Sequence, residues 1–212
     1  MERKYELHYD TELARALKKV VERIRDDIWV TNPEAKLYMR IAGGTGVHLY
    51  TGYRQTEDID AENNFTSRFN TDDITEIISD GKGGVYEYGF DRKFTTGLTL
   101  FHEDYIDNCI EYNIGIEGVD ISIMHPVDIA VSKIERLSDD DREDIAVMFS
   151  MGLFTYDELK KRIEEAMLCH VGGLRELPYK IKTVLDMVEK IEKQPTEMSD
   201  NPDPPQTKKN TP

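Results

Sequence analysis

The sequence predicts an α/β fold of the α+β type, in which a small mixed sheet precedes a C-terminal helical bundle. Between residues 37 and 123, short runs of alternating apolar and polar residues are separated by glycine-containing turns, a pattern typical of strands. From residue 126 onward, apolar residues recur at helical spacing. The 212 residues suffice for one ordinary domain with a helical extension and a buried core, and two full-sized domains are not expected.

The expected elements follow from the same periodicities and from the residues that begin and end them. Helices are predicted over residues 12–24, 70–78, 126–137, 141–150, 155–170 and 178–193. Strands are predicted over residues 37–41, through Asp58 and Asp60, and over residues 85–90, 98–101, 105–114 and 119–123. A glycine turn and a short helix are expected between the first two strands.

These elements divide the chain into three parts. Residues 1–125 carry the predicted sheet, and residues 126–194 form the helical region. Residues 195–212 are rich in Pro, Asn, Asp, Thr and Lys, with Met198 as their only large apolar side chain. We expect this segment to be a disordered tail, because it cannot bury enough apolar surface to offset its ordering entropy.

Composition excludes several classes of partner. The net charge of −15 argues against broad DNA or RNA binding, because phosphate contacts need clustered Lys and Arg, although a local basic groove remains compatible with it. No apolar run approaches the length of a membrane span, and the first residues lack the apolar stretch of a signal peptide. We therefore expect a cytoplasmic protein without a membrane partner. Cys109 and Cys169 lie far apart and show no metal-type spacing.

The most informative segment places a glycine turn a short distance before two carboxylates. Gly43, Gly44 and Thr45 follow an apolar run, so their amides and the Thr45 hydroxyl are expected to hold the phosphates of a nucleotide. Asp58 and Asp60 are two residues apart on a strand, where alternate side chains share a face. Two carboxylates on one face are suitable ligands for Mg²⁺. An ordinary glycine turn followed by a surface Asp-x-Asp is the alternative.

This segment resembles the nucleotidyltransferases of the polymerase-beta type, whose signature is a Gly-Gly or Gly-Ser turn followed by Asp-x-Asp. Together with the later run HPVDIAVSKIERLSDDDREDI, it looks most like the bacterial branch that includes AbiEii-type toxins and the DUF6036 group. The resemblance covers roughly residues 37 to 150. It implies a nucleotidyltransferase fold in residues 1–125 and a toxin-antitoxin or defence setting, with a cognate antitoxin or toxin as a possible partner.

Enzymes of this type complete the metal site with a third carboxylate from a neighbouring strand. Asp120 fits that place, because its side chain would share a face with Ser122, and Glu117 is the alternative. The expected metal ligands are therefore Asp58, Asp60 and Asp120, with two Mg²⁺ ions and an NTP as substrate. An exposed strand aspartate with no role is the other interpretation of Asp120.

Arg54 and Thr56 precede the Asp-x-Asp and are candidate nucleotide-binding residues, since a guanidinium can hold a phosphate with two hydrogen bonds. Arg54 could equally pair with Glu57 or Glu62.

Lys133 and Arg136 lie one helical turn apart, so both project from one face. The resemblance implies that Lys133 meets the triphosphate and that Asp144 helps to orient the attacking group. Pairing of Lys133 and Arg136 with Asp140, Asp141 or Asp144 is the alternative.

The sequence therefore predicts Mg²⁺-dependent transfer of a nucleoside monophosphate from an NTP to a hydroxyl or phosphate of an RNA or protein acceptor. A catalytically inactive module of the same fold, acting as a nucleotide-sensing or antitoxin-like protein-binding partner, is the alternative. A true third carboxylate beside Asp58 and Asp60 would favour the first interpretation.

Overall fold

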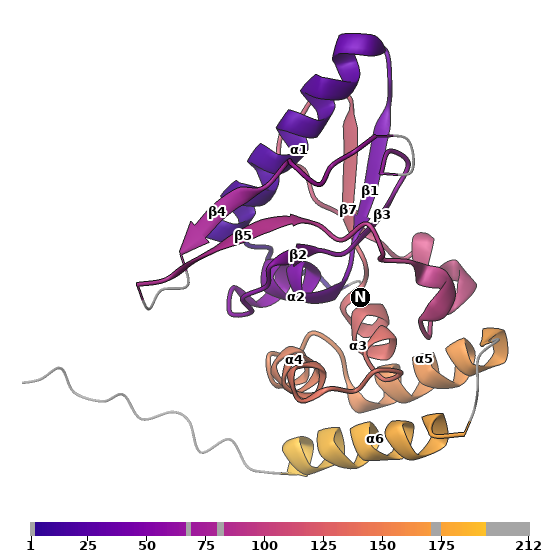
Figure 1. Ribbon diagram of the computed structural model, residues 1–212. Coiled ribbons are helices and arrows are strands. Elements are labelled where there is room, and N and C mark those ends of the chain that lie inside the picture. Colours follow the sequence, from indigo (N-terminus) through magenta and orange to yellow (C-terminus); the bar gives the residue numbers. More distant parts are fainter. Residues whose placement is uncertain (1–2, 67–68, 80–82, 171–174, 194–212) are drawn as a thin grey trace, which may run out of the picture.

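The computed structural model describes residues 3–66, 69–79, 83–170 and 175–193. Two small sheets and the N-terminal helix form one layer of the molecule, and four helices from the C-terminal half lie beneath it (Figure 1). This is the mixed α+β architecture predicted from the sequence. The helices of the described residues are all too short or too polar to cross a membrane.

The first sheet has four strands, β1 (Leu37–Ile41), β3 (Ala61–Asn63), β6 (Ile110–Glu111) and β7 (Val119–Ile123). Their order is β3-β1-β7-β6. β1 pairs in parallel with β7 and antiparallel with β3, and β6 pairs antiparallel with β7. Because β1 and β7 run in parallel, their carboxyl ends meet at one edge, where the chain continues into α2 and α3.

The second sheet has three strands, β2 (Asp58–Ile59), β4 (Glu76–Ser79) and β5 (Val85–Phe90), in the order β2-β5-β4. β2 pairs in parallel with β5, and β4 pairs antiparallel with β5. Only Asp60 separates β2 from β3. The Asp-x-Asp segment therefore joins the two sheets.

The N-terminal helix α1 (Glu12–Thr31) begins at Thr11, whose hydroxyl accepts a hydrogen bond from the Ala14 amide. One stripe of the helix is buried and belongs to the same core as the apolar residues of β1 and β7. The helix also contacts β4 and β5. The polar face of β1 and β7 is left on the other side of the sheet.

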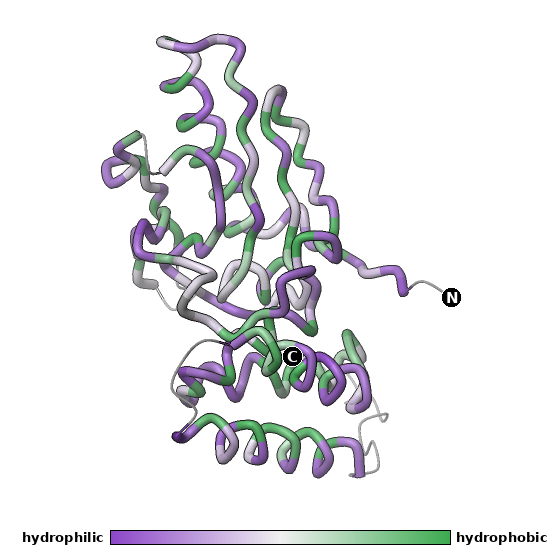
Figure 2. Tube along the Cα trace, turned by 90° about the vertical axis from the view of Figure 1, so that its right-hand side faces the viewer, coloured by the Kyte–Doolittle hydropathy of each residue, from purple (hydrophilic) through white to green (hydrophobic). Residues whose placement is uncertain are grey.

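The remaining helices are α2 (Gly43–Thr51), α3 (Pro126–Ser132), α4 (Asp139–Ser150), α5 (Tyr156–Cys169) and α6 (Leu177–Lys193). α2 contacts α3 and α4, and α6 packs on α4 and α5. The apolar residues of α6, the lowest helix in Figure 2, face the other helices. Ser138 and Thr155 each begin a helix with a capping box. Two short 3₁₀ helices, Thr96–Leu98 and Glu103–Ile106, precede β6.

Four predicted elements were wrong. The predicted helix over residues 70–78 is a turn followed by β4: the Asn70 side chain accepts from the Asp72 amide in a tight turn, and only Ile78 of β4 is buried. The predicted strands at 98–101 and 105–114 are largely irregular backbone that follows the ends of the two 3₁₀ helices, with strand pairing only in β6. The helix predicted to reach residue 137 ends at Ser132. The tail at 195–212 lies outside the described residues.

Candidate active site

The first residue of α2 lies directly against Asp60. Gly43 has a φ of +53°, and a Cβ at this position would stand 1.8 Å from Asp60 Oδ2. Only glycine meets both conditions, because a side chain would be strained by the backbone and would collide with the carboxylate. The expected turn at residues 43–45 is therefore the first turn of α2, with its amides beside Asp60.

Thr45 and Thr56 fix the Asp-x-Asp segment onto α2. The buried Thr45 hydroxyl donates to the Asp58 carbonyl oxygen at 2.9 Å and lies 3.0 Å from the Tyr88 hydroxyl. A Cβ at Gly44 would stand 2.8 Å from Thr56 Oγ1, so the Thr56 side chain packs against this glycine. The expectation that the Thr45 hydroxyl binds phosphate was wrong, because that hydroxyl is buried and already used. Both threonines position the carboxylates.

A third carboxylate, Asp91, stands beside the pair. In the parallel pairing of β2 with β5, Ile59 lies opposite Phe90, and the Asp91 amide donates to the Ile59 carbonyl oxygen at 3.3 Å. Burial raises the pKa of Asp60 to about 6; the charges of Asp91 and Asp58 add to the rise, whereas those of Lys133 and Arg136 oppose it.

Burial also raises the pKa of Asp58, and the charges of Asp91 and Glu57 raise it further. Asp91 therefore acts electrostatically on both members of the pair. Sequence reasoning missed it, and the only signal for it was an aspartate at the end of a predicted strand.

The expected third carboxylates are elsewhere. Asp120 pairs with Tyr38, three residues before the end of β1, which corresponds to about 10 Å along the strand from the α2 end of the sheet. Asp120 and Glu117 line a different cavity from Asp60. The structure therefore does not bring Asp120 or Glu117 to the pair, because β7 meets this edge with Ile123 rather than with Asp120.

Asp60 and Asp91 open into a cavity of about 420 Å³ together with cationic side chains. The lining residues are Gly43, Asp60, Asp91, Lys93, Phe94, Thr95, Thr99, Ser132, Lys133, Glu135, Arg136 and Asp141. The cations therefore face the carboxylates across one space, an arrangement that suits a ligand with both phosphates and a bound metal ion.

Lys133 and Arg136 are held by aspartates of α4. The ammonium of Lys133 is buried, 2.8 Å from Asp144 Oδ2 and 3.3 Å from Asp141 Oδ1. Arg136 donates two hydrogen bonds of 2.7 Å to Asp141, yet 73% of its side chain is exposed. Burial favours the neutral form of Asp141, but the hydrogen bonds from Arg136 and Ser138 and the charge of Lys133 hold its pKa well below the usual range.

The pairing considered as the alternative for the two cations is therefore present, while both side chains also line the cavity with Asp60. Asp144 lies behind Lys133 rather than in the cavity with Asp60.

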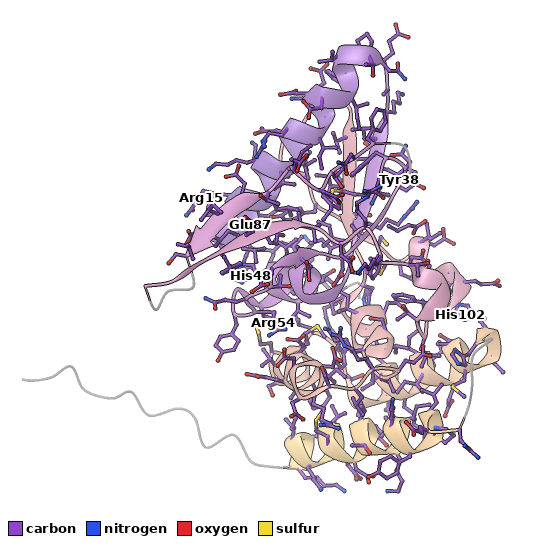
Figure 3. The ribbon with its side chains drawn as sticks, in the orientation of Figure 1. Arg15, Tyr38, His48, Arg54, Glu87 and His102 are labelled. Atoms are coloured by element: carbon purple, nitrogen blue, oxygen red, sulfur yellow. The ribbon has the colours of Figure 1, made fainter. Side chains whose placement is uncertain are left out.

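Arg54 joins the loop after α2 to α4. Its guanidinium lies 3.2 Å from Asp140 Oδ2 and 3.4 Å from Asp144 Oδ1, and Figure 3 shows it between the two helices. Arg54 therefore pairs with two aspartates of α4 instead of with Glu57 or Glu62, the partners considered as the alternative to nucleotide binding. Arg54 lines a cavity of about 320 Å³ with Asp144, and that cavity does not include Asp60.

The donor chemistry of the carboxylates fits Mg²⁺. In the described part of the chain, no three Asp, Glu, His or Cys side chains converge tightly enough to hold a metal ion as they stand. Asp58, Asp60 and Asp91 nevertheless offer hard oxygen ligands, and the charge of Asp91 adds to the rise in the pKa of both Asp58 and Asp60. The Asp60 carboxylate makes no hydrogen bond or ion pair with any described residue, and glycine leaves its Oδ2 uncovered on one side. A divalent cation would offset the electrostatic repulsion between these carboxylates.

Comparison with known proteins agrees with this geometry. Residues 15–190 match the model of a family described as a nucleotidyltransferase of unknown function, DUF6036. Neither a curated protein nor a solved structure matches the chain in the corresponding searches. The match spans both sheets and all the C-terminal helices. On this evidence the chain belongs to the DUF6036 family of nucleotidyltransferases.

Proposed function

We propose that the protein transfers a nucleoside monophosphate from an NTP to a hydroxyl or phosphate of a protein or RNA acceptor, with Mg²⁺ as cofactor. One observation carries the proposal. The Gly43 backbone lies against Asp60, and Asp60 shares a cavity with Asp91, Lys133 and Arg136. This is the charge pattern that a metal-bound triphosphate requires.

The cationic side of the cavity is suited to the β and γ phosphates. The exposed Arg136 guanidinium keeps donors beyond the two that bind Asp141. Lys133 supplies a buried positive charge, and Lys93 an exposed one. The free amides at the N-terminus of α2 add partial positive charge.

The carboxylate side would hold the metal. Asp58, Asp60 and Asp91 are the ligands we propose, in two ion sites, with Asp91 replacing the expected Asp120. When bound, Mg²⁺ supplies charge neutralisation for the pyrophosphate leaving group and lowers the pKa of the attacking hydroxyl. One oxygen of Asp91 accepts the Lys93 amide at 2.7 Å, which fixes the carboxylate at the end of β5.

The proposed reaction is a single substitution at the α-phosphorus of the NTP. The acceptor oxygen forms a bond to the α-phosphorus, and the bond from that phosphorus to the bridging oxygen breaks, so pyrophosphate leaves with its electron pair. The second oxygen of the Asp91 carboxylate takes the proton of the acceptor hydroxyl. The cations of the cavity stabilise the charge that develops on the leaving group.

A catalytically inactive, nucleotide-sensing module is the second candidate, and one observation favours it. Lys133, Arg136 and Arg54 are all paired with aspartates of α4, which reduces the positive charge offered to a phosphate. For both candidates, we also propose a relationship to AbiEii-type proteins, with a toxin-antitoxin setting and a cognate protein partner.

Calorimetry with each of the four NTPs, in Mg²⁺ and in EDTA, tests the site directly. We expect binding only with Mg²⁺, and loss of binding in Asp60→Asn and Asp91→Asn. Asp120→Asn is the matched control, because it removes the same charge from a different cavity and should bind NTP as the wild type does.

Incubation with α-labelled NTP, cellular RNA and lysate protein then distinguishes transfer from sensing. Label in an acceptor supports the enzyme, whereas Mg²⁺-dependent binding without any transfer supports the inactive module. Equal NTP affinity with and without EDTA would contradict both.

A further inference from the structure

A second cavity, separate from the one at Asp60, lies on the polar face of the first sheet. Its volume is about 910 Å³, and β1, β7 and the segment from Cys109 to Gly118 line it. The buried residues of β1 face the core that contains α1, whereas Tyr38 and Arg40 point away from it. Figure 3 shows Tyr38 on the side of β1 away from α1. None of the residues proposed to bind nucleotide lines this cavity.

The strand register connects this face to the proposed active site. Burial alternates along the Asp-x-Asp segment: Ile59 and Ala61 are buried, whereas Asp60 and Glu62 are half-buried. Glu62 lies opposite Arg40, and Arg40 lies opposite Ser122. Asp60 lies two residues before Glu62, about 7 Å along the chain, and its side chain is on the same face as Glu62, Arg40 and Ser122.

A second row lies one step further from the site. Tyr38 is paired with Asp120, at about 13 Å from Asp60 along the strands. On the side toward Asp60 this polar floor ends at Glu62, which accepts a hydrogen bond from the buried Tyr105 hydroxyl at 2.5 Å and does not line the cavity.

The charge of this floor is negative. Glu62 lies 3.5 Å from Arg40 and neutralises it, and the Arg40 guanidinium stacks on Tyr38 at 4.7 Å. Glu111, Glu117 and Asp120 are exposed, and none of them forms an ion pair with any described residue. Three uncompensated carboxylates over a cavity in a chain of net charge −15 repel a phosphate backbone and attract ammonium and guanidinium groups.

We propose that this face docks a basic segment of a protein acceptor, so that the acceptor of the proposed transfer is a protein rather than an RNA. This inference rests on the proposed function for the position of the reacting hydroxyl, but not for the docking itself. An extended chain rises about 3.3 Å per residue. A Lys or Arg held at Asp120 therefore lies about four positions along an extended chain from a hydroxyl-bearing residue beside Asp60, and the chain between them passes Glu62 and Tyr105.

Fluorescence anisotropy with labelled hexalysine, hexaglutamate and decaadenylate RNA at low ionic strength tests the docking surface. The cavity variant combines Glu111→Gln, Glu117→Gln and Asp120→Asn. The control variant makes the same change in net charge at exposed sites away from the cavity, Asp73→Asn, Glu87→Gln and Glu164→Gln. Figure 3 shows Glu87 on the side of the molecule opposite Tyr38.

We expect hexalysine to bind the wild type, and its affinity to fall about tenfold in the cavity variant, the sum of three exposed charge pairs. The control variant should retain at least half of the wild-type affinity. Equal weakening in both variants would mean general attraction to an acidic protein and would overturn the proposal. Binding of the RNA in preference to hexalysine would overturn it as well.

A second measurement separates this inference from the proposed function. Asp60→Asn should lose Mg²⁺-dependent NTP binding while binding hexalysine as the wild type does. The cavity variant should bind NTP as the wild type does while its affinity for hexalysine falls. Failure of NTP binding alone would contradict the proposed function and leave the docking surface intact. Failure of the hexalysine difference alone would refute the docking surface and leave the nucleotide site intact.

Discussion

Replacing Asp60 by asparagine should stabilise the protein at neutral and alkaline pH, although it removes a proposed metal ligand. Burial, followed by the charges of Asp91 and Asp58, raises the pKa of Asp60 from 3.8 to about 6. The folded protein therefore binds this proton more tightly than the unfolded chain does. Stability falls as the pH rises from about 4 to about 6, and ionised Asp60 continues to cost folding free energy above that window.

The size of the effect follows from the shift. About two pKa units, at about 1.4 kcal/mol per unit, give a cost of about 3 kcal/mol. The carboxylate keeps some contact with solvent in the cavity, so we expect about 2 kcal/mol in practice. For a chain of this size that difference raises the melting temperature by about 4–8 °C.

Urea unfolding of the wild type and Asp60→Asn at pH 8 and pH 4.5, without divalent ions, measures this difference. The variant should be more stable by about 2 kcal/mol at pH 8, and the gain should largely disappear toward pH 4. A variant no more stable than the wild type at pH 8 would refute the reasoning. So would a gain of the same size at both pH values, because it would not come from ionisation.

Asp141→Asn is a control of opposite sign. Hydrogen bonds from Arg136 and Ser138 hold the pKa of Asp141 well below its usual range, so the ionised form stabilises the fold. That contribution is present above about pH 4 and is lost as the pH falls. The variant should lose about 3 kcal/mol at pH 8, because it leaves Arg136 without its carboxylate partner and removes one of the two carboxylates that hold the buried Lys133.

Further outcomes follow from the same site. Asp58→Asn and Asp91→Asn should fold normally and lose detectable nucleotidyl transfer, as measured with α-labelled NTP, and normal turnover in both would make the cluster structural. Gly43 and Gly152 both have a positive φ, so Gly43→Ala and Gly152→Ala should each lose about 1–2 kcal/mol of stability in urea unfolding. Only Gly43→Ala should also weaken Mg²⁺-NTP binding, at least about tenfold. A Cβ would displace Asp60 at Gly43, whereas at Gly152 it would meet nothing within 4 Å. Deleting residues 195–212 should leave both the melting temperature and the NTP affinity unchanged, and a drop of several degrees would show that the segment docks on the body.

The parts of the site that the sequence predicted are those specified locally. The strand, the glycines and the Asp-x-Asp lie within 24 residues of one another, and each constrains its neighbours through strand alternation or the helix start. The position of Gly43 against Asp60 follows directly from that short connection. The pairing of Lys133 and Arg136 with aspartates of α4 was the alternative considered for these two residues, and it too is local, because α3 and α4 are close in sequence.

Asp91 could not be predicted, because it depends on which strands pair. Its place beside Asp60 requires a parallel pairing of β2 with β5 in one register, and a shift by one residue would turn the carboxylate to the other face. The prediction that Asp120 is the third carboxylate was wrong for a related reason. Its face on β7 was predicted correctly, but the parallel register with β1 places it at the wrong end of the sheet. The helix predicted over residues 70–78 was wrong because Asn and Asp are common both at the start of helices and in turns.

The energetics of Asp60 argue against a purely structural role for this carboxylate. An ion pair can be kept for stability alone, as with Asp141, whose pKa is lowered by its partners. Asp60 is the opposite case: it makes no hydrogen bond or ion pair with any described residue, and two further carboxylates raise its pKa. A protein that used this fold only as a scaffold would be more stable with a neutral side chain here. A cost of this kind in folding free energy is typical of functional sites, so it supports the cation site that we propose at Asp58, Asp60 and Asp91.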